Sequence, residues 1–421
     1  MPENGDLREL RRLFHRNPEP GWCEFWTTAK IVEEIERIGV DEIHVGPDAI
    51  DSEQRLGVPD EQELSSWMER AKDELDDHAV LDEVAGGNTG VVAVIDNGEG
   101  PCVGLRVDID ALPIDESTDS DHAPAAEGFR STNDGFMHAC GHDAHITFGL
   151  GALEELSNRD FSGTFKVFFQ PSEELLGGGK AMANTEHVAD LDRLMGVHVG
   201  LGRQTGAVVA GLDEALALSR FDIAFEGESA HAGLAPNDGQ NAVQALVTAA
   251  DNMYSIPRHE DGVTRVNVGE IRSENAANVI ADSATAKAEV RGGSTQLMEY
   301  MKEAVYERLE HAAGMHGCEL DVTVIGESIR QDCDEEMVDV VYETAVEIDA
   351  VTSPSRRDAL GASEDATYLM KAVAESGGKA TYIGIGASNP SGHHTPTFDI
   401  DEDCLPIGVS VLSRTALSLL N

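Results

Sequence analysis

In the first half of the chain, segments with apolar residues at helical spacing alternate with short, continuous apolar runs. Residues 7–16 and 27–38 have apolar side chains at helical spacing, which predicts two amphipathic helices. Val91–Ile95 and Cys102–Val107 are short apolar runs joined by a Gly-rich turn, which predicts two strands. A further helix is predicted over 143–158. This alternation is typical of an α/β sheet covered by helices.

Three more apolar runs predict strands in the same sheet. They are FSGTFKVFFQPSEE (161–174), LDRLMGVHVG (191–200) and ATYIGIG (380–386). The first ends in polar residues and the second includes His198. The sheet is therefore expected to be built from both the first and the last parts of the chain.

The pattern changes near residue 216. The elements expected from there on are a strand over 217–231, a helix over 239–256, strands over 264–274 and 285–294, a helix over Leu297–Gly314 and a strand over 318–326. The order β-α-β-β-α-β is the ferredoxin-like pattern. We therefore predict an α/β domain formed by 1–215 and 331–421, with a smaller α+β domain, 216–330, inserted into it. The densely charged segment 41–83 is expected to be an inserted loop with one exposed helix.

The charge of the chain is strongly one-sided. Its 421 residues include 78 Asp and Glu against 30 Lys and Arg, a formal net charge of -48, while 41% are hydrophobic. Such a surface repels nucleic acid and anionic membranes. Because the acidic residues are dispersed, they favour a protein from a halophilic host. In molar salt the electrostatic screening length falls to about 3 Å, so repulsion among the acidic side chains is suppressed. An unusually acidic mesophilic protein is the alternative.

The sequence gives no sign of secretion or membrane insertion. No stretch approaches the roughly 18 apolar residues that a transmembrane helix needs. The charged N-terminus lacks the apolar core of a signal peptide. The six cysteines show no disulfide spacing, so we expect a cytoplasmic protein with thiols available to bind metal.

The segment HACGHDAH (138–145) is the sharpest local signal for chemistry. Thiolate and imidazole are ligands for zinc and neighbouring transition metals. Cys140 and His142 are two residues apart, so in an extended segment they point to the same side. The alternative is a helix N-terminus with incidental histidines.

Two acidic clusters follow predicted strands. In DIDALP (108–113), Asp110 is a candidate for orienting a metal-bound imidazole, although an isolated DxD is more often a capped turn. In QPSEE (170–174), Glu173 and Glu174 could divide the handling of protons and the binding of metal between them. A surface pair of glutamates is the alternative there.

Two histidine positions complete the set. His198 lies within an apolar strand, and His393–His394 lie in the turn GHHTP (392–396). Each alone could be a core or loop histidine. Together, the five clusters lie at strand-to-loop junctions and supply ligands for two metals about 3.5–4 Å apart. Cys and His ligands favour Zn, Mn, Co or Ni without selecting one of them.

These motifs resemble the aminoacylase and carboxypeptidase G-like metallopeptidase family. HACGHDAH, FQPSEE and DIDALP look like its hippurate and auxin-conjugate hydrolase branch, over residues 7–418. AHAGLAPNDGQNA (230–242) and GHHTPTFDIDED (392–403) are most similar to the aminobenzoyl-glutamate hydrolase group. The resemblance implies a phosphorylase/hydrolase-like zinc-peptidase catalytic domain with an inserted lid or dimerisation domain.

The resemblance also implies a role for each matching residue. Cys140 would bridge two divalent metals, His142 and His198 would complete one site, and Glu174 with His394 would complete the other. Glu173 would be the general base. His394 is chosen over His393 because His394-Thr-Pro-x-Phe398 matches the family's His-Ser-Pro-x-Phe. His231 would polarise the substrate carbonyl, in its own chain or across a homodimer, and Asn278 and Arg291 would hold the substrate carboxylate or oxyanion.

The expected function is hydrolysis of an N-acyl or N-aroyl amino acid. A dipeptidase or an N-carbamoyl amino acid hydrolase could use the same centre, and a non-catalytic metal-binding chain working with a related second chain is a further alternative. The segment 361–370 keeps Ser363-Glu364-Asp365 but lacks the Phe that often follows in the family. This departure, with the segment 41–83, bears on the substrate more than on the chemistry.

Overall fold

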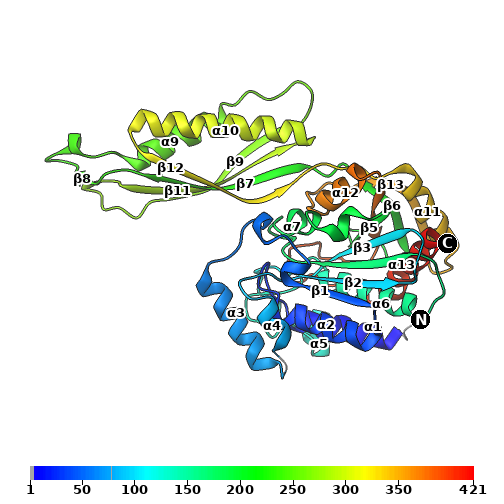
Figure 1. Ribbon diagram of the computed structural model, residues 1–421. Coiled ribbons are helices and arrows are strands. Elements are labelled where there is room, and N and C mark those ends of the chain that lie inside the picture. The colour runs from blue at the N-terminus through cyan, green and yellow to red at the C-terminus, as the bar shows by residue number, and fades with distance from the viewer. Residues whose placement is uncertain (1–3, 77) are drawn as a thin grey trace. The chain divides into compact units, whose positions relative to one another are not determined.

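The computed structural model describes residues 4–76 and 78–421, which form two compact units. Unit 1 comprises the chain up to Asp213, Gln331–Leu360 and Asp365–Asn421, and unit 2 comprises Glu214–Arg330 and Gly361–Glu364 (Figure 1). The short segment 361–364 joins unit 2 because the Leu216 N–H donates to the Ala362 carbonyl at 3.0 Å. The boundaries predicted from the sequence instead place these four residues in the larger domain.

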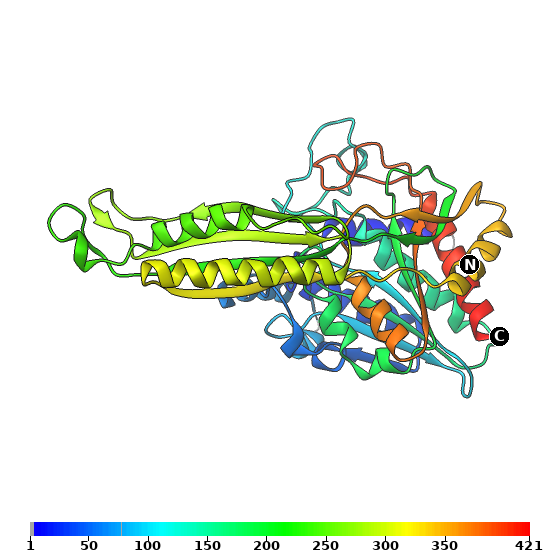
Figure 2. The same cartoon turned by 90° about the horizontal axis from the view of Figure 1, so that it is seen from above.

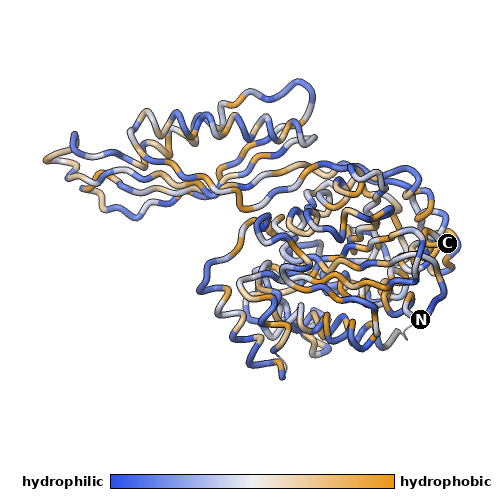
Figure 3. Tube along the Cα trace, in the orientation of Figure 1, coloured by the Kyte–Doolittle hydropathy of each residue, from blue (hydrophilic) through white to orange (hydrophobic). Residues whose placement is uncertain are grey.

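Unit 1 is built on a mixed sheet, which has eight strands among the described residues, in the order β1-β2-β4-β3-β5-β14-β6-β13. The strands are β1 (Glu42–Val45), β2 (Val91–Asp96), β3 (Cys102–Asp108), β4 (Thr164–Gln170), β5 (Arg193–Val199), β6 (Ala207–Asp213), β13 (Ser353–Ala359) and β14 (Lys379–Ile385). β4, β3, β5 and β14 are neighbours and run parallel. These strands are mostly apolar (Figure 3), and they are buried on both faces, as parallel strands require.

Helices cover both faces of this sheet (Figure 1). They are α1 (Asn4–Arg16), α2 (Phe25–Ile38), α3 (Glu61–Glu74), α4 (Ala79–Glu83), α5 (Ala123–Glu127), α6 (His142–Ser157), α7 (Gly179–Ala183), α8 (Glu186–Ala189), α11 (Glu335–Val346), α12 (Ala366–Glu375) and α13 (Cys404–Leu420), with short 3-10 turns η1 (Gly46–Asp48) and η2 (Ser52–Gln54). α6 is buried along almost its whole length, with α1, α2 and α13 packed on it. In the described part of the chain, no helix combines the length and the apolar character that crossing a bilayer requires.

Unit 2 has the β-α-β-β-α-β order with one helix layer on a four-stranded antiparallel sheet, β12-β7-β11-β9. Its elements are β7 (Ala217–Glu226), β8 (Ala230–His231), η3 (Pro236–Asp238), α9 (Ala242–Tyr254), β9 (Thr264–Arg272), β10 (Val279–Ile280), β11 (Ser283–Gly292), α10 (Thr295–His316) and β12 (Glu319–Ser328). α9 and α10 lie side by side on this sheet (Figure 2). This is the ferredoxin-like arrangement that the sequence predicts.

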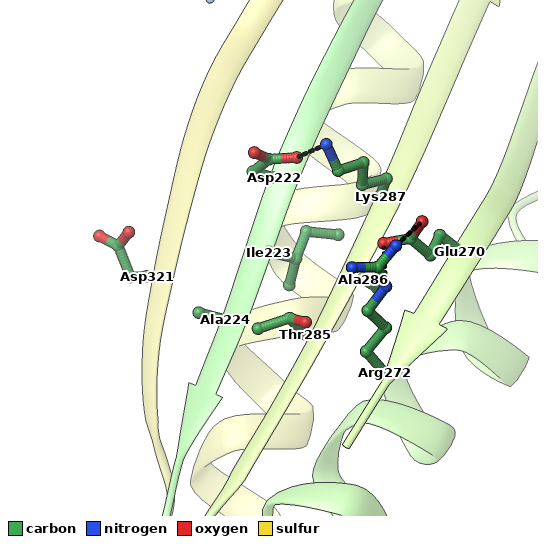
Figure 4. A pocket seen from close by; sticks show the side chains of 9 residues that line it. All are labelled: Asp222, Ile223, Ala224, Glu270, Arg272, Thr285, Ala286, Lys287 and Asp321. Carbon is green, nitrogen blue, oxygen red and sulfur yellow. Dashed lines mark hydrogen bonds and ion pairs between the residues drawn. The ribbon is translucent and has the colours of Figure 1, made fainter. Parts of the chain in front are cut away.

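The other face of the unit 2 sheet is polar. This face has a shallow hollow of about 260 Å³, which is lined by Asp222, Lys287, Glu270 and Arg272 among others. Both helices lie behind the strands (Figure 4). Lys287 Nζ lies 3.9 Å from Asp222 Oδ1, and Arg272 Nε lies 2.9 Å from Glu270 Oε1. Each cation in the hollow is therefore paired with a carboxylate, so the hollow presents no excess of positive charge to an anionic substrate.

The prediction for the segment 41–83 was wrong in part. Instead of a loop with one exposed helix, it contains β1, which pairs with β2, and the two helices α3 and α4. Val45, Trp67 and Leu81 are buried from this segment. The high density of charge conceals these widely spaced apolar anchors, because exposed polar residues lie between them.

A buried network of charges fastens α1 to the N-terminus of α6. Arg11 is fully buried, and its Nε donates to Asp143 Oδ2 at 2.7 Å. His15 bridges two carboxylates, with Nδ1 2.8 Å from Asp143 Oδ2 and Nε2 2.9 Å from Glu116 Oε1. Removing one member of such a network leaves a buried charge without compensation, which is strongly destabilising.

This network predicts a pH dependence of stability. Burial and Arg11 oppose a proton on His15, but the hydrogen bonds to Asp143 and Glu116 outweigh them and raise its pKa from 6.5 to about 9. The protonated ring therefore contributes about 3 kcal/mol below pH 6.5, and this contribution is lost as the pH rises through about 9. Thermal unfolding of the wild type should show this loss, and His15→Gln should be less stable and lack it. Identical pH profiles for the two proteins would contradict the assignment.

Candidate metal centre

The ends of four parallel strands bring the candidate residues to one edge of the unit 1 sheet. β3 leads into Asp108–Asp110, β4 leads into Glu173–Glu174, β5 contains His198, and β14 leads into the loop with His394. Carboxyl ends of parallel strands are where open α/β sheets place their sites. Strand direction therefore brings residues that are distant in sequence to the same edge.

Cys140 and His142 reach this edge through a tight turn at Gly141. The turn has φ +85°, and a Cβ at this position would lie 2.4 Å from Val199 Cγ1. Only glycine fits both the left-handed conformation and the close approach to β5. α6 begins immediately afterwards at His142. The turn thus fixes where the thiol and the imidazole on either side of it are placed.

The five sequence-predicted ligands lie close together. Cys140 Sγ is 3.5 Å from His198 Nε2, His394 Nε2 is 3.4 Å from Glu174 Oε2, and His142 Nε2 is 3.9 Å from Glu174 Oε1. Among the described residues, potential ligand atoms fall into four groups whose members all lie within 4.8 Å of one another: Cys140, His198 and His393; Cys140, Glu174 and His394; His142, Glu173 and Glu174; and Asp108, His142 and His145. Cys140 and Glu174 each belong to two of them, so the geometry is compatible with two neighbouring cations that share a ligand.

Asp110 makes hydrogen bonds to two of the candidate ligand residues, His142 and Glu174. His142 Nδ1 lies 3.1 Å from Asp110 Oδ1 and 3.0 Å from its backbone carbonyl, while Asp110 Oδ2 accepts the Glu174 N–H at 3.0 Å. With Nδ1 committed, the other ring nitrogen of His142 is the one available to a metal. This Nε2 atom is buried and makes no hydrogen bond to any residue in the described part of the chain. The residues present therefore fit a bound metal ion.

Local electrostatics favour added positive charge beside His142. Burial opposes protonation of this ring, but Asp108, Asp110 and Glu174 outweigh it and raise its pKa to about 10. His198 behaves in the opposite way, because burial and the neighbouring histidines hold its pKa well below the usual value. The carboxylates thus attract a proton or a cation to His142, and His198 stays neutral, as a metal ligand must.

His145 was not assigned a role from the sequence, and its contacts make it a support rather than a ligand. Its Nδ1 lies 3.0 Å from Asp108 Oδ2, and its Nε2 accepts the Val199 N–H at 3.0 Å. Burial lowers its pKa to about 4, so the ring is neutral with both nitrogens in use. It ties the ends of β3 and β5 together beside His198.

The two adjacent histidines of the 392–396 turn differ in their contacts. His393 Nε2 donates to the Val199 carbonyl at 3.1 Å. His394 adopts φ +58°, its N–H donates to the Ala139 carbonyl at 2.8 Å, and its side chain is directed towards Glu174. A left-handed non-glycine residue is uncommon and concentrates at functional sites. This geometry favours His394 as the ligand, although His393 also lies near Cys140 and His198.

Unit 2 places its three candidate residues at two ends of its sheet. His231 pairs with Val279, and the Ala232 N–H donates to the Asn278 carbonyl at 2.9 Å, so His231 and Asn278 are neighbours. His231 Nδ1 accepts the N–H groups of Gly233 and Leu234 at 3.1 and 3.2 Å, which leaves the proton of the neutral ring on Nε2.

Arg291 lies apart from that pair. It is opposite Leu218 near the other end of β11, eight residues (291 − 283) beyond Ser283, or roughly 26 Å along the strand. Its guanidinium makes two hydrogen bonds to Glu289, at 2.8 and 3.2 Å. A substrate carboxylate at Arg291 would therefore compete with Glu289.

The family comparison and the comparison with individual proteins agree with each other. Residues 104–418 match the family described as Peptidase family M20/M25/M40. The chain is 38% identical over 98% of its length to indole-3-acetyl-aspartic acid hydrolase of Enterobacter agglomerans, covering 95% of that protein. It is 37% identical over 98% of its length to a p-aminobenzoyl-glutamate hydrolase subunit of Escherichia coli (strain K12), again covering 95% of that protein.

Solved structures agree with the sequence comparisons. The crystal structure of an aminobenzoyl-glutamate utilization protein from Klebsiella pneumoniae superposes with a TM-score of 0.85 at 33% identity, covering 98% of this chain and 95% of that one. A dinuclear metal binding peptidase from Bacillus subtilis superposes with a TM-score of 0.68 at 21% identity, covering 99% of this chain and 98% of that one, and shows a shared fold.

Proposed function

The chain belongs to peptidase family M20/M25/M40, and on this premise we propose that it hydrolyses the amide bond of an N-acyl or N-aroyl amino acid. The family, the α/β fold and the hydrolase class predicted from the sequence are confirmed. The named relatives act on an aromatic acyl group joined to aspartic acid or to glutamate. We therefore propose aminobenzoyl-glutamate-like compounds, with an acidic amino acid, as the substrate class.

One observation carries the proposal. Five side chains with ligand atoms, from four separate parts of unit 1, surround one end of the sheet with Glu173 among them. The buried residues among the five are Cys140, His142 and His198. A Glu174 carboxylate oxygen lies near Cys140, and oxygens of both glutamates lie near His142. Such a set of donors is typical of a metal centre rather than of a packed core.

We assign two divalent cations to this centre, held by Cys140, His142, Glu174, His198 and His394. Bound there, they would supply Lewis-acid activation of water and of the substrate carbonyl. Asp110 would keep the His142 ring in the orientation that presents Nε2. The donor set is compatible with Zn, Mn, Co or Ni and does not distinguish among them.

Glu173 is our candidate for the general base. Its carboxylate is almost fully buried, and its Oε2 lies 4.0 Å from His142 Nε2. Glu173 therefore lies beside the proposed metal ligands but is not one of the five. A carboxylate in this position can take a proton from the attacking water and return it to the leaving amine. The adjacent Glu174 would bind metal, so the two neighbours would have separate tasks.

His231 is our candidate for stabilising the oxygen of the scissile carbonyl. Its Nδ1 accepts two backbone N–H groups, which leaves Nε2 available to donate a hydrogen bond to that oxygen. Asn278 would assist beside it, and Arg291 would bind a substrate carboxylate at the other end of the sheet. As the sequence predicts, His231 would serve either its own chain or a second copy of the chain in a homodimer, and the complementation experiment distinguishes the two.

A related second chain is the alternative partner that we propose. The Escherichia coli relative is named as one subunit of its hydrolase. A non-catalytic role, a dipeptidase and a carbamoylase remain alternatives that the substrate experiment separates. The halophilic host and the cytoplasmic location stay predictions from composition.

The function is tested by a substrate panel combined with a change at Glu173. The metal-loaded protein is assayed in low and in molar salt with aminobenzoyl-glutamate, hippurate, acetyl-amino acids, a dipeptide and a carbamoyl amino acid. We expect the fastest hydrolysis with aminobenzoyl-glutamate. Glu173→Gln should reduce kcat by at least about 100-fold while metal content, measured by elemental analysis, stays the same.

The panel also defines the outcomes that would reject the proposal. Hydrolysis of none of these compounds at either salt concentration would favour the non-catalytic alternative. Retained activity in Glu173→Gln would show that the mechanism is wrong. Exposed Glu127, which lies on α5, provides a control in which the same exchange should leave kcat and metal content unchanged.

The origin of the histidine donor is tested by complementation. Glu173→Gln and His231→Ala chains should each be nearly inactive alone. If His231 acts across a dimer, mixed dimers contain one complete site, so mixing and reassembling the two variants should restore up to roughly a quarter of wild-type activity, because half of randomly paired dimers are mixed. No recovery, with mixed dimers verified by mass spectrometry, would place His231 in the site of its own chain.

A further inference from the structure

The turn that presents Glu173 has an uncommon backbone conformation. Ser172 has φ +54°, which places a residue with a side chain in the left-handed region. The turn closes through the Gly177 N–H, which donates to the Ser172 carbonyl at 2.9 Å. Because the conformation is intrinsically unfavourable for serine, contacts from outside the turn must help to hold it.

Two buried carboxylates supply contacts on either side of Glu173. Glu24 Oε1 accepts the Ser172 N–H at 2.8 Å, and Asp110 Oδ2 accepts the Glu174 N–H at 3.0 Å. Both carboxylates have no exposed surface. The backbone of Glu173 is therefore fixed from both sides by hydrogen bonds to acidic groups.

Glu24 is itself held firmly. Its Oε2 accepts the hydroxyl of Thr89 at 2.6 Å, so both carboxylate oxygens have specific donors. Glu24 occupies the N-cap position of α2, but its side chain makes no capping hydrogen bond there. The segment before it lies directly against the turn, since a Cβ at Gly21 would be 2.7 Å from Ser172 Oγ. Glu24 thus directs its side chain away from its own helix and to the turn.

We propose that Glu24 is a positioning residue that holds the Ser172–Glu174 turn so that Glu173 can act on the attacking water. This inference rests on the proposed function, in which Glu173 is the general base. Glu24 acts through the backbone of Ser172 rather than by touching the reacting atoms. Its effect should therefore appear in the chemical step.

A neighbouring glutamate provides a matched control. Glu19 is also buried on the same segment, and it accepts the N–H groups of Trp26 and Thr27 at 3.0 and 2.8 Å. Its carboxylate therefore caps the first turn of α2, whereas that of Glu24 binds the turn at Ser172. Glu19→Ala and Glu24→Ala each remove two hydrogen bonds to a buried carboxylate, but only the second removes the one to Ser172.

The test compares these variants as metal-loaded full-length proteins. Glu24→Ala should lower kcat by roughly 10- to 100-fold with little change in KM or metal content, as expected for a misplaced catalytic group. Glu24→Gln should restore most of the activity, because the amide oxygen can still accept from Ser172 and burial already raises the pKa of Glu24 well above its usual value. Glu19→Ala should lower the thermal stability and leave kcat within about twofold of the wild type.

Hydrogen exchange provides a readout that does not depend on activity. The peptide covering 170–176 should exchange faster in Glu24→Ala and not in Glu19→Ala. If Glu24→Ala does not fold, Glu24→Asp, which withdraws the carboxylate by one methylene, replaces it in both measurements.

Several results would overturn the inference. These are unchanged kcat and exchange in Glu24→Ala, an equal loss of kcat in Glu19→Ala, or a loss of metal that accounts for the loss of activity. Failure of the proposed function is recognised separately, by a wild type that hydrolyses nothing or a Glu173→Gln variant that remains active. In that case the exchange measurement alone decides whether Glu24 holds the turn.

Discussion

Buried negative charge at the carboxyl ends of β3 and β4 is the feature on which the rest of unit 1 depends. Asp108, Asp110 and Glu173 are almost fully buried within a small volume, together with Glu174. Carboxylates in such surroundings are unfavourable unless positive charge or hydrogen-bond donors compensate them. Side chains of the protein provide part of this compensation. The carboxylates also raise the pKa of His142, which indicates that a bound cation can provide the remainder.

Two buried arginines provide part of this compensation near the candidate metal centre. Arg106 binds Asp108 and Asp365, with Nη2 3.0 Å from Asp365 Oδ1. Arg11 binds Asp143 next to the candidate ligand His142, and it also binds Asp399 in the loop that follows His394. Arg11 therefore joins two segments that are far apart in sequence and that present candidate metal ligands, whereas Arg106 joins the end of β3 to Asp365. Losing either one would disturb ligand placement as well as stability.

Much of this arrangement could be predicted from the sequence, for physical reasons. The ligand clusters are local strings at the ends of apolar runs, and parallel strands necessarily bring such ends together. The alternation over 216–326 was sufficient for the ferredoxin-like order. By contrast, β13 escaped prediction because it is a polar edge strand, SPSRRDA, with mostly exposed side chains. The roles of His145 and Glu24 depend on contacts across 54 and 148 residues, which no local pattern reveals.

The proposed centre holds two cations that share Cys140. Anomalous diffraction from crystals loaded with Zn or Mn, recorded on both sides of the metal absorption edge, locates such ions. We expect two anomalous peaks, with the Cys140 sulfur bound to both and His394 rather than His393 bound to one of them. A single peak, ions elsewhere in the fold, or a pair of ions bound through His393 would contradict the claim.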